Sequence, residues 1–151
     1  MTRINVIPPE LMLNEWVSAH CKETLRPINK LMQGKYVKNP IVGQYRLKTG
    51  HELWGAGHGV FLTKMWSRYK AEYAKRGFKG FDYEDSLDLS SYPVEYSNDY
   101  TPTVKDIRTN LARLCERFRK RKKPYHFYDT VIDSNKDFLV WLNKVKQEVL
   151  L

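Results

Sequence analysis

The chain has 151 residues, 42% of them hydrophobic and 28% charged, which is enough for one domain with a buried core. Its 26 basic and 17 acidic side chains give a formal net charge of +9. An excess of this size favours an anionic partner, most often a nucleic acid. The charge is also segregated, because residues 117–123 hold six basic side chains whereas residues 78–102 hold six acidic ones and a single lysine.

Several classes of protein are disfavoured. No apolar run reaches the length that crosses a membrane, and the first residues lack the apolar core of a signal peptide. Cys21, Cys115 and the four histidines have no spacing typical of metal ligands. We therefore expect a monomer that binds no membrane, metal or cofactor. We expect it in the cytoplasm, which is the host cytoplasm if the gene is carried by a phage.

The first predicted helix covers residues 9–33, with Pro8-Pro9 at its start and Gly34 after its end. Apolar and small residues recur along it at three- and four-residue steps, which indicates one buried face. This face comprises Leu13, Val17, Cys21, Thr24, Ile28 and Leu31. Trp16, Glu23 and Arg26 fall on a different side.

Pro27 interrupts this helical pattern. It has no backbone N–H, so the carbonyl of Glu23 loses its helical partner. We expect a kink or a break near Glu23, in the form of one bent helix or of two shorter helices that meet there.

Three further helices are predicted, over residues 58–76, 103–119 and 134–150. Thr103 is expected to cap the start of the helix over residues 103–119. Their apolar faces comprise Leu62, Met65, Tyr69 and Tyr73; Val104, Ile107, Leu111, Leu114 and Phe118; and Phe138, Trp141, Leu142, Val145 and Val149. Only residues 41–47 have a weak strand pattern. The predicted fold is an all-α, compact, single-domain helical bundle over residues 1–151, with long irregular connections at 34–55 and 78–102 and a C-terminal helix.

A basic row follows the predicted helix 103–119. Arg113, Arg117 and Arg121 recur every four residues, on a face separate from the apolar one. Side chains at this spacing can follow the phosphates of a DNA backbone.

The first residues suggest covalent chemistry. Removal of Met1 would make Thr2 the N-terminus, and an α-amine with a pKa of about 7.7–8.0 has a much larger unprotonated fraction near neutral pH than a lysine amine. Such an amine can attack the anomeric carbon of a sugar, displace its base and leave an imine. The carboxylate of Glu23 could then remove a C2′ proton, which expels the 3′ phosphate. Arg3 and Arg26 would neutralise the neighbouring phosphates.

Seven short segments occur in the order found in a known family. They are Met1-Thr-Arg-Ile-Asn5, Glu23 with Arg26, Gly55-Ala-Gly-His58, Lys75-Arg-Gly-Phe78, Asp99-Tyr-x-Pro102, Ala112-Arg113 and Tyr125-His-Phe-Tyr128. Together they resemble the pyrimidine-dimer DNA glycosylases of T-even bacteriophages, the phage endonuclease V family. The resemblance covers residues 1–128, and residues 129–151 form a helical extension without a counterpart. It implies an all-helical glycosylase and abasic-site lyase that acts on ultraviolet-damaged duplex DNA.

The resemblance also assigns residues to roles. Thr2 supplies the nucleophilic amine and Glu23 the carboxylate. The DNA-binding positions comprise Arg3, Trp16, Lys22, Arg26, His58, Arg113, Arg117, Arg121, Tyr125 and His126. Three of them differ from the family's best-known member: Trp16 replaces a DNA-contacting histidine, Lys22 an arginine, and His126 a lysine. His58 could instead be a histidine that packs locally at a helix start.

Two alternative functions are compatible with the same residues. The same imine chemistry could serve other lesions, such as ring-opened purines or plain abasic sites. The chain could also be a DNA-binding protein without catalysis, although such a protein would need neither the amine of Thr2 nor the carboxylate of Glu23. A metal-dependent nuclease is disfavoured, because no cluster of acidic residues and histidines has a suitable spacing.

Overall fold

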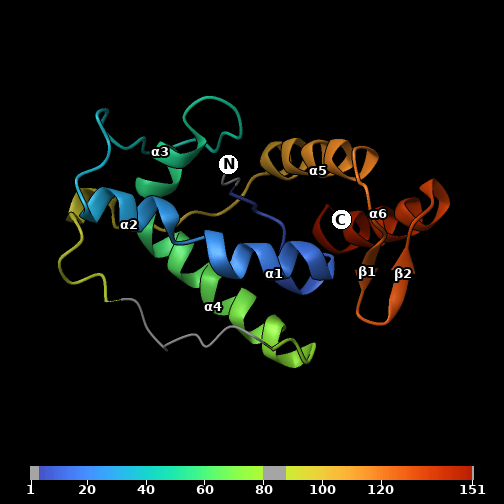
Figure 1. Cartoon of the computed structure of the whole chain (residues 1–151). Coiled ribbons are helices and arrows are strands. Elements are labelled where there is room, and N and C mark those ends of the chain that lie inside the picture. Colours follow the sequence, from blue (N-terminus) through green and yellow to red (C-terminus); the bar gives the residue numbers. More distant parts are fainter. Residues whose placement is uncertain (1–3, 80–87, 151) are drawn as a thin grey trace.

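The computed structural model describes residues 4–79 and 88–150, and these residues are mostly helical (Figure 1). They also contain a small antiparallel hairpin, in which β1 (Tyr125–Phe127) pairs with β2 (Thr130–Ile132). The prediction of a mostly helical protein is confirmed, but the stricter all-α class is wrong. The hairpin turns at Tyr128, which has a positive φ of 53°, and its strands are too short for a sequence pattern to reveal.

The first predicted helix is divided into three pieces. A 3-10 turn at Pro9–Leu11 precedes α1 (Asn14–Glu23), and α2 (Arg26–Met32) follows after Thr24 and Leu25. The break falls beside Glu23, as the position of Pro27 predicts. Pro27 lies in the first turn of α2, where its missing N–H is tolerated. Five of the six residues predicted for the inner face are buried, and Leu31 is partly buried.

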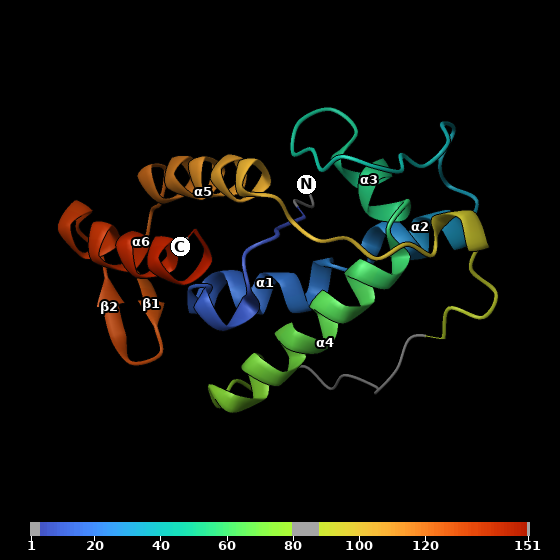
Figure 2. The ribbon, with the colours of Figure 1, turned by 180° about the vertical axis from the view of Figure 1, so that it is seen from behind.

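Two helices pack behind this pair. The short helix α3 (His51–Ala56) contacts α2, and the long helix α4 (Gly59–Lys75) packs along α1 (Figures 1 and 2). The apolar face predicted for α4 is buried throughout, and Gly77, with a φ of +79°, follows its end. Helix α3 was not predicted, since all but its last residue fall in the segment 34–55 that was expected to be irregular. Residues 41–47 form no strand.

The C-terminal part contains α5 (Val104–Arg119), the hairpin, and α6 (Asn135–Val149). Thr103 caps α5 as predicted, in a capping box with Asp106, and Ser134 and Asp137 form the same arrangement on α6. Most residues predicted for the inner faces of both helices are buried, but Ile107 and Val149 are only partly buried and Val104 at the start of α5 is 49% exposed.

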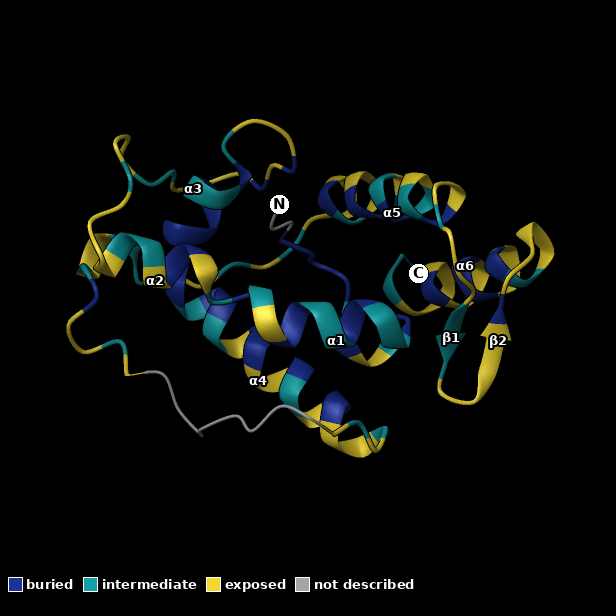
Figure 3. Ribbon diagram, viewed as in Figure 1, coloured by how far each residue is buried: buried dark blue, intermediate teal, exposed yellow. Residues whose placement is uncertain are grey.

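One hydrophobic core connects all of these elements. The extension after residue 128 belongs to it, because Trp141 of α6 packs against Trp16 of α1 and donates its indole N–H to the carbonyl of Leu11. The N-terminal segment, residues 4–7, runs through the core and is buried along its whole length (Figure 3). Burial therefore fixes the path by which the chain approaches its N-terminus.

Candidate active site and nucleic-acid interface

Glu23 and Arg26 lie on either side of the break between α1 and α2. Glu23 is the last residue of α1, with a side chain that is 29% exposed, and Arg26 is the first residue of α2. Arg26 Nη1 lies 3.8 Å from Glu23 Oε1. The carboxylate at the end of α1 is therefore accessible to solvent. Lys22, beside it, is exposed.

The predicted nucleophile, Thr2, and its neighbour Arg3 lie outside the described residues. Ile4, the first residue described, is 3% exposed. A β-carbon built on Gly55 of α3 would lie 3.3 Å from Ile4 Cγ1 and 3.1 Å from Pro27 Cγ. Residue 4 therefore lies beside the first turn of α2, about one helical turn along the chain from Glu23. The described chain leads to the break that presents Glu23.

The Gly55-Ala-Gly-His58 motif has a structural explanation. Gly55 leaves space for Ile4 and Pro27, and a β-carbon on Gly57 would lie only 2.2 Å from the carbonyl oxygen of Ile41. Gly55 thus permits close packing against the N-terminal segment, whereas Gly57 permits the close approach of the backbone at Ile41.

His58 is buried at 2% exposure, stacks on Trp54 and donates from Nδ1 to the carbonyl oxygen of Trp54 at 2.7 Å. Burial lowers its pKa, so the ring is neutral near pH 7. The prediction of His58 as a DNA-binding residue is corrected: it packs locally at the start of α4, and its ring does not reach the surface.

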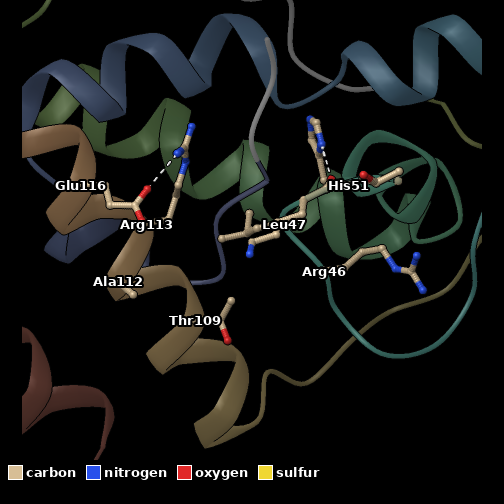
Figure 4. A pocket seen from close by; sticks show the side chains of 10 residues that line it. Arg46, Leu47, His51, Thr109, Ala112, Arg113 and Glu116 are labelled. Carbon is tan, nitrogen blue, oxygen red and sulfur yellow. Dashed lines mark hydrogen bonds and ion pairs between the residues drawn. The ribbon is translucent and has the colours of Figure 1, made fainter. Parts of the chain in front are cut away.

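A cavity of about 840 Å³ lies between α5 and residues 46–51, next to the N-terminal segment (Figure 4). Its rim contains Arg46 and Lys48, both exposed, and Arg113 from α5. The N-terminal segment borders the same part of α5, because the amide of Val6 bonds the side chain of Asn110. Arg46 and Lys48 were not predicted as site residues, because no periodic pattern marks an irregular segment.

The three arginines of the α5 row are not equivalent. Arg113 pairs with Glu116 of the same helix, with 3.1 Å between Nη1 and Oε2. Arg121 bonds the carbonyl oxygens of Phe118 and Asp133 and covers the Phe118 ring, which ties the end of α5 to the start of α6. Arg117 lies close enough to His20 of α1 for its charge to affect the histidine.

The remaining predicted positions lie at the other end of α1. Trp16 is 2% exposed and packs against Tyr125 and Trp141, so its placement among the DNA-facing residues is corrected: the ring belongs to the core. Tyr125 is half-buried on this tryptophan. The imidazole of His126 pairs with Glu15 of α1, at 2.7 Å between Nδ1 and Oε2. The structure therefore does not bring Tyr125 and His126 together with Glu23.

His20 is a buried residue of this region that the sequence analysis did not single out. Burial, with a smaller contribution from the charge of Arg117, lowers its pKa to about 3. In an unfolded chain a histidine titrates near ~6.5. Below that pH the unfolded state binds a proton that the folded state excludes, so folding stability falls as the pH drops.

We therefore expect the free energy of unfolding to decrease between pH ~6.5 and the folded pKa of about 3, by up to ~1.4 kcal/mol per pH unit from this one group. Above pH ~6.5 His20 should contribute no pH dependence. Urea denaturation of the wild type and of His20→Gln should show a difference that changes with pH only within this window. Parallel pH dependences for the two proteins would contradict the assignment.

No known family model matches the chain. Among residues 4–79 and 88–150, no helix is both long enough and apolar enough to cross a membrane, and no group of three or more histidine, cysteine or acidic residues could hold a metal ion.

Proposed function

We propose that the protein is a base-excision DNA repair glycosylase with abasic-site lyase activity, which acts on pyrimidine dimers in duplex DNA through the amine of Thr2. The observation that supports this proposal most is the path of the N-terminal segment. Ile4 is buried beside Pro27, and two residues extend the chain by no more than about 7 Å. The first described residue thus lies about one helical turn from Glu23, which supports a reaction of an N-terminal amine beside this carboxylate.

The two groups suffice for the reaction. The neutral amine attacks C1′ of the damaged nucleotide, the glycosidic bond breaks, and the base leaves with the electron pair and a proton. The second amine proton passes to O4′ as the C1′–O4′ bond breaks, and the nitrogen lone pair forms the C1′=N double bond of an imine with Thr2. Glu23 removes a C2′ proton, the electron pair forms the C2′–C3′ double bond, and the 3′ C–O bond breaks so that the phosphate leaves.

The charge around Glu23 and the cavity fits a DNA backbone. Lys22 and Arg26 lie beside the carboxylate, and Arg46 and Lys48 lie on the rim of the cavity next to the N-terminal segment. Cations at these positions would neutralise the phosphates on either side of the reacting nucleotide. The net charge of +9 supplies the longer-range attraction.

One observation favours a second candidate, in which the same imine chemistry acts on other lesions, such as ring-opened purines or abasic sites. Position 16, where the resembling family has a DNA-contacting histidine, holds a tryptophan that is 2% exposed. A buried tryptophan ring cannot make the DNA contact of that histidine, so the groups that recognise the lesion differ from those of the resembling family.

Borohydride trapping tests the proposal. The protein, with its N-terminal mass verified to begin at Thr2, is incubated with duplexes that carry a pyrimidine dimer, a ring-opened purine or an abasic site. We expect a covalent protein–DNA adduct, because borohydride reduces the imine to a stable amine. The abasic duplex, which needs no base removal, shows whether the amine reacts, and the damaged base whose duplex gives the faster adduct identifies the lesion. Tight binding to the abasic duplex without any adduct would instead support a non-catalytic DNA-binding protein.

A further inference from the structure

The N-terminal segment is held by polar contacts from three different parts of the fold. The hydroxyl of Tyr45, in the connection before α3, donates a hydrogen bond to the carbonyl of Ile4. Asn110 of α5 accepts from the amide of Val6 at 2.7 Å and donates to Asn5 Oδ1 at 2.6 Å. The side-chain amide of Asn5 contacts Nε2 of His20 on α1.

The donors and acceptors of this network match throughout. Asn110 donates to the side-chain oxygen of Asn5, and the side-chain NH₂ of Asn5 donates to Nε2 of His20. Because Nε2 accepts this hydrogen bond, the His20 ring is neutral and carries its proton on Nδ1. The low pKa of His20, about 3, keeps it in this form near neutral pH. Burial likewise raises the pKa of Tyr45 well above its usual value, so its phenol remains a donor.

Burial of the N-terminal segment does not by itself require these hydrogen bonds. Ile4, Val6 and Ile7 already fill apolar space, being 3%, 4% and 0% exposed. Buried polar groups contribute little net stability but are costly when left unpaired, so they favour one arrangement over its alternatives. A slip of the N-terminal segment by one residue would break the contacts of Ile4, Asn5 and Val6 together. It would also move the chain end by about 3.3 Å.

We propose that Tyr45, Asn110 and His20 are positioning residues, which fix the register of residues 4–6 and thereby hold the N-terminal amine at the distance from Glu23 that imine formation requires. This inference rests on the proposed function, because it assumes that the amine reacts. Tyr45, Asn110 and His20 are 6%, 0% and 2% exposed, so we expect them not to contact DNA. Their effect is on the rate of the covalent step and not on affinity.

The structure offers a matched pair of variants. Tyr45→Phe removes the hydrogen bond to the carbonyl of Ile4, and Tyr92→Phe removes a comparable bond to the carbonyl of Ala56. Tyr45 and Tyr92 are both buried, at 6% and 4% exposure, so the loss of stability should be similar. Only Tyr45 contacts the N-terminal segment. For each protein we would measure the single-turnover rate of borohydride trapping on abasic DNA, the affinity for the same duplex, and stability by urea denaturation.

We expect Tyr45→Phe to slow trapping at saturating protein by at least about tenfold, since a misplacement of ~1 Å can cost ~100-fold. Affinity should stay within about twofold of the wild type, and Tyr92→Phe should trap at the wild-type rate. A second pair guards against misfolding: His20→Gln keeps an acceptor for Asn5 and should retain most of the rate, whereas His20→Leu should lose it.

The outcomes separate the two proposals. If the wild type forms no adduct on any duplex, the proposed function fails. If the wild type forms the adduct and Tyr45→Phe matches it, or slows no more than Tyr92→Phe, the positioning role is wrong while the proposed function stands.

Discussion

A protein that keeps Met1, or that carries one added residue before Thr2, is expected to lose imine formation and strand cleavage together. An added residue moves the α-amine by about 3.3–3.6 Å along the chain. Since the N-terminal segment is buried and hydrogen-bonded at residues 4–6, it cannot slide to compensate. A misplacement of ~1 Å can already cost ~100-fold, so we expect a loss of at least about that size in borohydride trapping.

The control is the same residue added after Leu151, which leaves the N-terminal segment unchanged. Both proteins should bind the abasic duplex with wild-type affinity, because the cations of the interface are unaltered. Mass spectrometry establishes the N-terminus of each preparation before it is used. Full trapping by the N-terminally extended protein would show that another amine reacts, and it would overturn the assignment of Thr2.

The parts of the fold that the sequence predicts are those with long, regular periodicity. Residue spacing predicts the apolar faces of α4 and α6, and Thr103 at the expected position predicts the cap of α5. Pro27 predicts the break before α2. The six-residue helix α3 could not be predicted in this way, because it is too short for a period to emerge and it contains glycine. Its position depends on long-range packing against α2.

The candidate site was predictable only in part. Glu23 could be singled out because Pro27 marks the break that exposes it. The burial of Trp16 depends on Trp141, which lies 125 residues further along the chain, and no local pattern records that contact. A signal for His20 did exist: it lies three residues after Val17 and four before Thr24, on the buried face of α1, where a polar ring needs a partner. That partner, Asn5, is within the motif that opens the chain.

Glu23→Gln is expected to separate the two steps of the reaction. The substitution keeps the shape of the side chain at the end of α1, but a neutral amide cannot accept the C2′ proton. Strand cleavage at an abasic site should therefore fall by about 10²–10⁴-fold at saturating protein, which is the usual contribution of a general base. Imine formation depends on the amine and not on this proton transfer, so borohydride should still trap the variant on the same duplex.

Glu52→Gln is the matched control for this prediction. Glu52 of α3 has a similarly exposed side chain, at 23% against 29% for Glu23, and it also pairs with a cation of α2, with 3.1 Å to Lys30 Nζ. Both variants remove one negative charge near α2, so both should bind DNA at least as tightly as the wild type. Only Glu23→Gln should lose cleavage. If Glu23→Gln cleaved at a near-normal rate, the base that takes the C2′ proton would lie elsewhere. Equal losses in the two variants would mean that charge near α2, and not proton transfer by Glu23, limits the reaction.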